Sequence, residues 1–177
     1  PLDTLDIQNT YGLAKRTAEH LCAIFGQNSE LEIVIARCFS FIGRDLPTDV
    51  HFAAGNFLRD ALYNERIVVN SDGAAMRSYL DQADLARYLL CLLVRGRAGQ
   101  AYNVGSDEAV SIRSLAYLVR DIASPQKQVV FNEDRHQVSI RNRYVPDVSK
   151  IKQEFGLSPT IQLTDSVKSM VHALRES

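Results

Sequence analysis

The order of the first two segments constrains the fold most, because a helix-forming run is followed directly by a strand-forming one. Between residues 10 and 25 apolar side chains recur with the helical period, and Gly26 is placed to end the helix. Residues 31–38 are mostly apolar and rich in β-branched side chains, as in strands buried in a parallel sheet. Together they predict an α/β layer. Residues 39–49 are then expected to form a loop beyond the carboxyl end of the strand, where α/β proteins usually place ligands.

The rest of the chain continues to alternate between helical and extended patterns. Helices are predicted at about 52–64, 83–94, 112–122, 147–155 and 164–174, and extended segments at 66–70, 77–80, 101–105, 127–131 and 143–146. The expected helix caps are Ser111, Asp147, and either Thr164 or Asp165. Residues 132–142 are polar without a period and are expected to form a loop. With no repeat or linker, residues 1–177 are expected to pack as one unit.

Composition and charge exclude several classes of function. The formal net charge is −1, from 20 basic and 21 acidic residues. Such a balance gives no electrostatic footprint for nucleic acid or an anionic membrane, so we expect neither as a partner. No apolar run approaches the length of a membrane span. The four histidines have no metal-binding spacing, and we expect no metal site.

The cysteines indicate the redox environment of the protein. Cys22, Cys38 and Cys91 lie far apart, each within an apolar stretch. An odd number of widely spaced cysteines is typical of free thiols in a reducing compartment. We therefore expect all three to be buried and unpaired, in a cytoplasmic protein.

A Tyr-x-x-x-Lys pair, Tyr11 and Lys15, lies at the start of the first predicted helix. Residues four apart share one helix face, and a cation beside a phenol favours its ionised form. Tyr11 could then act as a general acid or base. Both residue types also suit amphipathic helices, so the spacing alone favours a chance pairing over a catalytic one.

The order of the motifs along the chain gives the pair a context. The landmarks are Tyr11-Gly12-x-x-Lys15, Arg37-x-Phe39-x-x-x-Gly43, Ile67-Val68-Val69 before Asp72-Gly73, Arg77-Ser78-Tyr79, Ala83-Asp84-Leu85-Ala86, Tyr102-Asn103-Val104-Gly105-Ser106 and Pro146-Asp147-Val148-Ser149-Lys150. In this order the chain resembles the carboxyl-terminal portion of the extended short-chain dehydrogenase/reductases, the nucleotide-sugar epimerase/dehydratase family. The local sequences around Arg77 and Tyr102 are similar to those of members that act on 4-keto-6-deoxy sugars.

The resemblance implies an α/β fold with one part that binds the cofactor and another that binds the substrate. It implies the carboxyl-terminal part of a Rossmann-like doubly wound parallel sheet plus a smaller mixed α/β substrate-binding lobe. Residues 1 to about 50 would end the dinucleotide-binding domain. Residues from about 51 to 177 would form mostly the sugar-nucleotide-binding lobe, with some segments returning to the sheet.

The resemblance also assigns catalytic and cofactor roles. Tyr11 would exchange a proton with a sugar oxygen while hydride moves to or from NAD or NADP, and Lys15 would hold the ribose hydroxyls of the cofactor. Phe39 and Ser40, with Phe41 beside them, would contact nicotinamide and sugar. Family members often have Asn where this chain has Ser40, which leaves the sugar contact open.

The implied substrate is a nucleotide-diphosphate sugar. Arg77 occupies the position of the family's diphosphate-binding arginine, and guanidinium groups match phosphate oxygens well. Arg141 or Arg143 lies near a second such position, although either could equally be a solvated side chain. Asn56 would contact the diphosphate, and Val68 would border the base.

Two further expectations follow from the resemblance. The nine glycines form no Gly-x-Gly-x-x-Gly turn, so that turn is expected upstream, in a larger enzyme of which this chain is an inactive fragment. The helix carrying Tyr11 and Lys15 is expected to form a homodimer interface. Asp84 is expected to be a structural residue rather than a catalyst.

The leading hypothesis is an NAD(P)-dependent epimerase/dehydratase acting on a nucleotide-diphosphate sugar, with a 4-keto-6-deoxyhexose reductase as a specific variant. The alternative is a non-catalytic ligand-sensing or scaffold protein of the same fold. A third reading is a truncated gene product with only a packing role.

Overall fold

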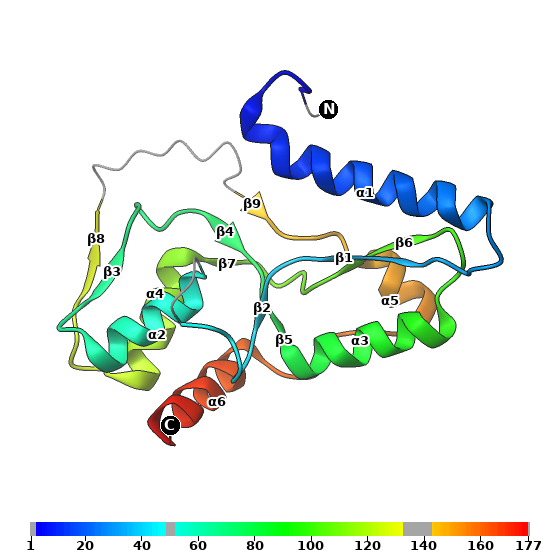
Figure 1. Cartoon of the computed structure of the whole chain (residues 1–177). Helices are drawn as coiled ribbons and strands as arrows, with labels where there is room; N and C mark the ends of the chain where they lie inside the picture. Colours follow the sequence, from blue (N-terminus) through cyan, green and yellow to red (C-terminus); the bar gives the residue numbers. More distant parts are fainter. Residues whose placement is uncertain (1–2, 49–51, 133–142, 177) are drawn as a thin grey trace.

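A computed structural model describes residues 3–48, 52–132 and 143–176. Helices alternate with short strands along this chain (Figure 1). The helices are a short 3-10 helix η1 (Ile7–Asn9), α1 (Thr10–Gln27), α2 (Ala53–Tyr63), α3 (Gln82–Arg95), α4 (Ile112–Ala123), α5 (Ser149–Phe155) and α6 (Leu163–Glu176). The strands are β1 (Ile35–Cys38), β2 (Phe41–Ile42), β3 (Ile67–Val69), β4 (Met76–Arg77), β5 (Leu80–Asp81), β6 (Ala101–Val104), β7 (Val110–Ser111), β8 (Val129–Phe131) and β9 (Arg143–Tyr144).

Most of the strand pairs are parallel, which confirms the predicted α/β class. Strand β1 pairs with β6, β2 with β5, β3 with β8 and β4 with β9, all in parallel. In the described parts of the chain, only β4 and β7 run antiparallel. The partners are distant in sequence: Ile35 is in register with Ala101, and Ile67 with Val129. Parallel strands need such crossover connections, and here helices supply most of them.

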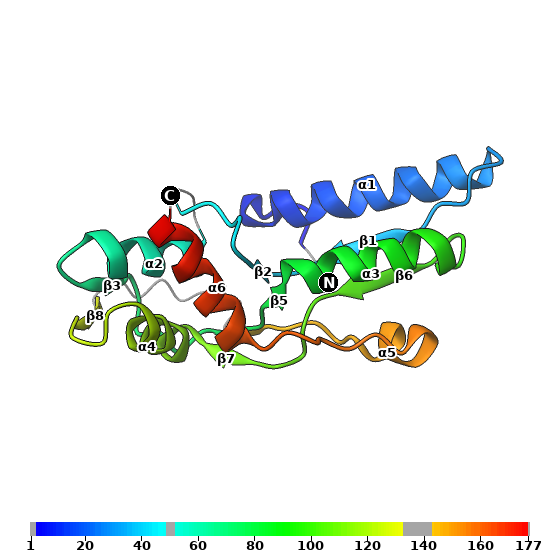
Figure 2. The same cartoon turned by 90° about the horizontal axis from the view of Figure 1, so that it is seen from below.

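Two hydrophobic clusters hold the elements together. One cluster joins α2, α4 and α6 to β3, and its fully buried side chains include Leu58, Leu115 and Met170. The other joins α3, α5 and β6 around Tyr88 and Tyr102, which are 1% and 0% exposed. Figure 2 shows the first group of helices at one end of the molecule, with β1, β6, α3 and α5 at the other.

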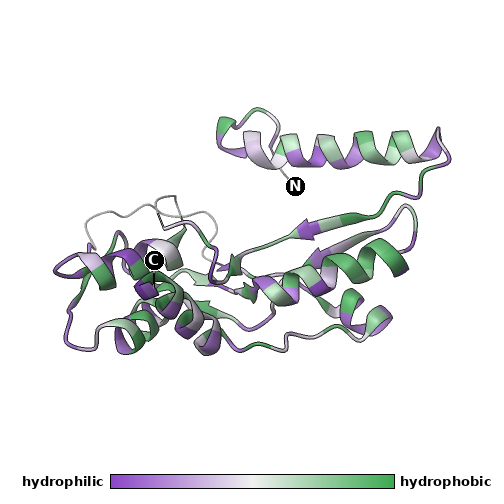
Figure 3. Ribbon diagram, turned by 60° about the horizontal axis from the view of Figure 1, so that its bottom comes forward, coloured by the Kyte–Doolittle hydropathy of each residue, from purple (hydrophilic) through white to green (hydrophobic). Residues whose placement is uncertain are grey.

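Helix α1 lies over the β1–β6 pair but is packed less tightly than the other helices. None of its residues is buried, and Leu21 and Phe25 on it are 59% and 57% exposed. Figure 3 shows the helix standing away from the rest of the molecule in that view. The apolar period therefore predicted the helix correctly. The described residues, however, do not cover its apolar face.

Some predicted boundaries and caps are wrong. The strand predicted at residues 31–38 begins only at Ile35, and the expected loop after it contains the short strand β2. The last helix begins at Leu163, so Thr164 and Asp165 lie in its first turn instead of capping it. Ser111 does cap α4, since its hydroxyl accepts a hydrogen bond from the Ser114 backbone N–H at 2.9 Å.

The predicted burial of the cysteines is also wrong. All three are free thiols, but Cys22 and Cys38 are exposed and Cys91 is only half-buried. Cys22 lies on α1, where no residue is buried, and Cys38 lies at the end of β1. Apolar neighbours in sequence did not decide burial, because burial depends on what other elements pack against each face.

Candidate functional site

The structure brings three predicted substrate-binding residues together around one hollow. Asn56 of α2, Val68 of β3 and Arg77 of β4 all line a cavity of about 870 Å³. They are separated by up to 21 positions in sequence but meet because α2 packs along β3. We call this cavity the larger hollow. Its size and mixed polar lining suit a small ligand with several hydrogen-bonding groups.

Hydrogen bonds at the carboxyl end of α2 fix one wall of the larger hollow. The Asp60 carboxylate accepts a hydrogen bond from Asn64 Nδ2 at 2.8 Å and another from the Val68 backbone N–H at 3.1 Å. Asp60 is only 7% exposed, so these contacts join α2 firmly to the start of β3. Val68 is thereby held at the edge of the cavity.

A smaller hollow of about 520 Å³ adjoins the larger one. Phe39, Ser40 and Phe41, which follow β1, line it together with Tyr79 and Arg77. Arg77 lines both hollows, so the two adjoin at this residue. Burial raises the pKa of Tyr79 to about 12. The positive charge of Arg77 lowers this pKa, but by less than burial raises it. Tyr79 therefore remains a hydrogen-bond donor at neutral pH.

The two other arginines predicted to bind phosphate are placed differently. Arg143 lies on β9, where it is in register with Met76, the neighbour of Arg77 on β4. It is exposed and does not line either hollow. The centre of the Tyr144 ring lies 4.8 Å from that of Phe39, so β9 packs against the segment that follows β1. Arg141 lies outside the described residues.

Tyr11 and Lys15 share one face of α1, as their spacing predicts. The Nζ atom of Lys15 lies 5.6 Å from the centre of the Tyr11 ring. Both side chains are exposed, Tyr11 to 74%. Neither residue lines the larger or the smaller hollow. The geometry thus brings the pair together without placing it at either cavity.

Sequence reasoning missed four charged residues of the larger hollow. The hollow is lined, alongside the predicted Asn56, by Arg59, Asp60, Glu65 and Arg66. Helical periodicity could have found two of them, because positions three and four after Asn56 lie on the same helix face. Arg66 follows the end of α2, where no such period applies.

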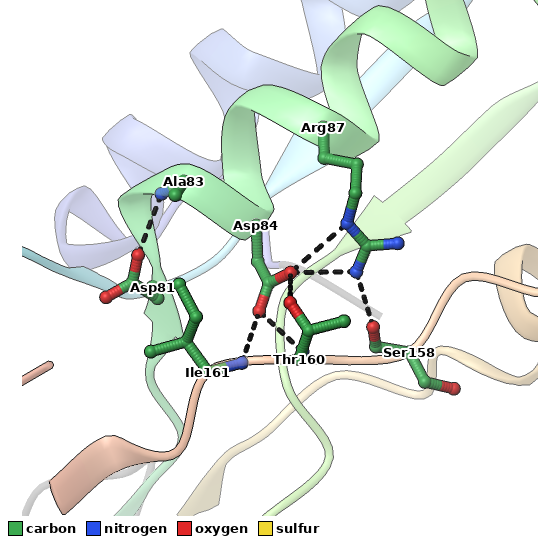
Figure 4. A network of polar contacts seen from close by, with 7 residues as sticks. All are labelled: Asp81, Ala83, Asp84, Arg87, Ser158, Thr160 and Ile161. Atoms are coloured by element: carbon green, nitrogen blue, oxygen red, sulfur yellow. Dashed lines mark hydrogen bonds and ion pairs between the residues drawn. The ribbon is translucent and has the colours of Figure 1, made fainter. Parts of the chain in front are cut away.

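Asp84 has the structural role expected of it. Its carboxylate, 1% exposed, accepts hydrogen bonds from the Thr160 and Ile161 backbone N–H groups at 2.7 and 3.0 Å and pairs with Arg87 at 2.7 Å (Figure 4). Burial tends to raise the pKa of this carboxyl, but the donors from Arg87, Thr160 and Ile161 outweigh it and lower the pKa. The network joins α3 to the segment before α6.

The described ranges contain neither a candidate metal-binding cluster nor a helix suited to span a membrane. No group of three or more side chains there could hold a metal ion. No helix in those ranges is long and apolar enough to cross a bilayer.

Comparison with known proteins assigns the chain to a family. Residues 2–105 match the model of the NAD dependent epimerase/dehydratase family. UDP-glucuronic acid decarboxylase 4 of Arabidopsis thaliana is 26% identical over 175 residues, which cover 99% of this chain and 39% of that protein. UDP-glucuronic acid decarboxylase 1 of Xenopus tropicalis is 24% identical over 166 residues, covering 94% of this chain and 39% of that protein.

Solved structures share the fold. UDP-glucose 4-epimerase from Thermotoga maritima, solved with UDP-glucose, superimposes with a TM-score of 0.84 at 22% identity, over 94% of this chain and 53% of that one. RMD from Pseudomonas aeruginosa, complexed with NADPH, gives a TM-score of 0.80 at 27% identity, over 94% of this chain and 56% of that one. The chain thus spans well under half the length of those decarboxylases and about half of these solved chains.

Proposed function

The chain belongs to the NAD-dependent epimerase/dehydratase family, and from this premise we propose that it binds a nucleotide-diphosphate sugar and serves hydride transfer between that sugar and NAD or NADP. One observation carries the proposal. Asn56, Val68 and Arg77 line a single hollow, and Arg77 joins it to a second hollow lined by Phe39 and Ser40. A ligand with a nucleotide at one end and a sugar at the other suits two joined cavities.

The charges suggest how such a substrate would lie. Arg77 stands where the hollows join, and a guanidinium there would meet the diphosphate that links nucleotide to sugar. Asn56 could donate an amide hydrogen to the same phosphates. The sugar would then occupy the smaller hollow beside Ser40 and Tyr79, both of which carry hydroxyl groups.

The available donors fit one end of the dinucleotide cofactor. The Lys15 ammonium lies near the Tyr11 ring on the exposed side of α1, and these two groups can donate hydrogen bonds to the two hydroxyls of a ribose. The cofactor, when bound, supplies or accepts the hydride. Tyr11 Oη would donate or accept the proton of the reacting sugar oxygen, while Lys15 would orient the ribose and favour the ionised phenol.

Substitution of Tyr11 tests this role in the protein that contains the chain. Tyr11→Phe should abolish turnover of nucleotide-diphosphate sugars while nearly preserving NAD(P) binding, because the proton donor is lost but Lys15 still holds the ribose. Tyr63→Phe is a suitable control, since Tyr63 is similarly exposed, at 67%. Unchanged turnover of the Tyr11→Phe protein would overturn the proposed acid/base role. Saturation-transfer NMR against a panel of sugar nucleotides would identify which of them the protein binds.

A non-catalytic ligand-binding protein is the second candidate, and one observation favours it. Tyr11 and Lys15 lie outside both hollows, so the substrate cavities exist without the catalytic pair. This candidate predicts sugar-nucleotide binding with no turnover in the intact protein, and with no change in ligand affinity on Tyr11→Phe substitution.

A further inference from the structure

The larger hollow carries a buried carboxylate that the proposed substrate does not yet explain. Asp60 lines the hollow and is 7% exposed. A carboxylate is an unusual lining for a cavity expected to hold a diphosphate, because like charges repel. Its place in the fold therefore constrains which end of the ligand lies near it.

Charged side chains lie in both parts of the hollow. Arg77 and Ala53 belong to the part shared with the smaller hollow, whereas Asp60 lines only the larger one, as do Arg59, Glu65 and Arg66. Ala53 and Asp60 are seven residues apart on α2, which corresponds to about 10 Å along the helix axis. Phosphates near Arg77 would thus leave the nucleobase end of the ligand toward Asp60.

The carboxylate retains hydrogen-bonding capacity. An ionised carboxylate offers about four acceptor sites, two on each oxygen. Among the described residues, Asn64 Nδ2 donates to Oδ1 at 2.8 Å and the Val68 N–H donates to Oδ2 at 3.1 Å. The nearest guanidinium nitrogen, Nη2 of Arg59, is 3.7 Å from Oδ1 and forms an ion pair without a hydrogen bond. Each oxygen therefore keeps a site for a further donor.

We propose that Asp60 selects a guanine nucleotide at this site, an inference that rests on the proposed function. Two adjacent acceptors require two adjacent donors, and guanine presents them on one edge as its ring N1–H and its 2-amino group. Uracil and thymine present a single N–H between two carbonyl oxygens, which would face the carboxylate. Cytosine and adenine present one amino group beside a ring nitrogen that accepts. Guanine is the common base whose edge matches a carboxylate at two points.

Nucleoside diphosphates test the inference on the unmodified chain. Isothermal titration with GDP, IDP, UDP, CDP and ADP should give the lowest Kd for GDP. IDP lacks only the 2-amino group and should bind about tenfold more weakly, the cost of losing one charge-assisted hydrogen bond. Equal Kd values for GDP and IDP, or a preference for UDP, would overturn the inference while leaving the proposed function intact. Absence of binding by every diphosphate would reject both.

A matched pair of variants separates recognition from structure. In Asp60→Asn the amide offers an acceptor and a donor, so the advantage of GDP over IDP should disappear. Asp72→Asn makes the same change of charge nearby, at an exposed residue outside the lining, and should keep that advantage. Thermal unfolding of both variants checks folding. A folded Asp60→Asn protein that retains the full preference for GDP would assign Asp60 a purely structural role.

Discussion

The Arg37 Nη2 atom lies 2.6 Å from Oε2 of Glu19, and Arg37 Nε donates to Oε1 at 2.8 Å. This two-point ion pair joins β1 to the middle of α1, the helix that carries Tyr11 and Lys15. The hydrogen bonds from Arg37 lower the pKa of Glu19 more than partial burial raises it. Because α1 buries no residue of its own, the pair is an important tether for the proposed catalytic residues.

Glu19→Gln should loosen α1 without unfolding the protein. Both side chains are partly exposed, so the pair contributes at most about 1 kcal/mol and less at high salt. Hydrogen exchange of α1 amides should accelerate while exchange in α4 stays unchanged. Glu30→Gln, an exposed residue beyond the helix, is the control. Equal exchange in α1 for both variants would show that the ion pair does not hold the helix.

Asp84→Ala should destabilise the fold by about 3 kcal/mol, because it leaves buried donors and the Arg87 charge without their partner. Asp165→Ala is a matched control, since Asp165 pairs with Lys168 at the same i,i+3 spacing but is 60% exposed. That change should cost less than about 0.5 kcal/mol. Urea unfolding measures both values, and similar losses in the two variants would contradict the assigned role of Asp84.

Asp84 should also make the fold sensitive to acid. Its pKa is lowered in the folded chain, so the unfolded chain binds the proton first as the pH falls. The stabilisation is complete above the ordinary value of about 3.9 and is lost as the pH falls through the lowered folded pKa. Asp84→Asn should flatten this part of the stability curve. Thermal unfolding between pH 5 and pH 2 would test it, and parallel curves for both proteins would refute it.

Gly55→Ala should destabilise the protein, although alanine usually stabilises a helix relative to glycine. An added methyl group would approach the Pro47 carbonyl oxygen to 2.5 Å, and backbone cannot move away cheaply. The clash should outweigh the gain of about 1 kcal/mol expected from helix propensity. Because Asn56 is the next residue, nucleotide affinity should fall as well. Gly99→Ala, where a methyl group meets nothing within 4 Å but the backbone φ is +73°, separates strain from crowding.

Leu93→Glu should reduce self-association of the chain. Leu93 and Val94 on α3 are 81% and 80% exposed, and exposed apolar side chains grouped on one helix favour association. Sedimentation velocity should show a lower average mass for the variant at equal concentration, with unchanged thermal stability. Identical sedimentation of the two proteins, or a monomeric parent chain, would exclude association through α3.

The helices could be predicted closely because their signals are local. The apolar period and the Ser111 cap place α4 within a residue of its observed bounds. Strand ends were harder, since β1 begins where pairing with β6 begins, and Ala101 lies 66 positions after Ile35. No local pattern reports the register of such distant partners.

The site could be predicted in part for a similar reason. Motif positions identified Asn56, Val68 and Arg77, and the fold brings these three together. The contribution of Asp60 depends on where α2 meets β3, which sequence spacing alone does not give. The roles of Tyr11 and Lys15 remain predictions. Their position relative to the substrate depends on where the cofactor and the sugar nucleotide bind.

Arg77 forms part of both hollows, whereas most other lining residues belong to one hollow only. Substitutions should therefore be tolerated less at Arg77 than at those residues. A change at Arg77 would disturb every ligand that bridges the two hollows. Residues at the far end of α2, such as Asp60, line one hollow only. Mutational libraries confined to that end should therefore retune nucleotide preference while the chemistry applied to the carbohydrate stays the same.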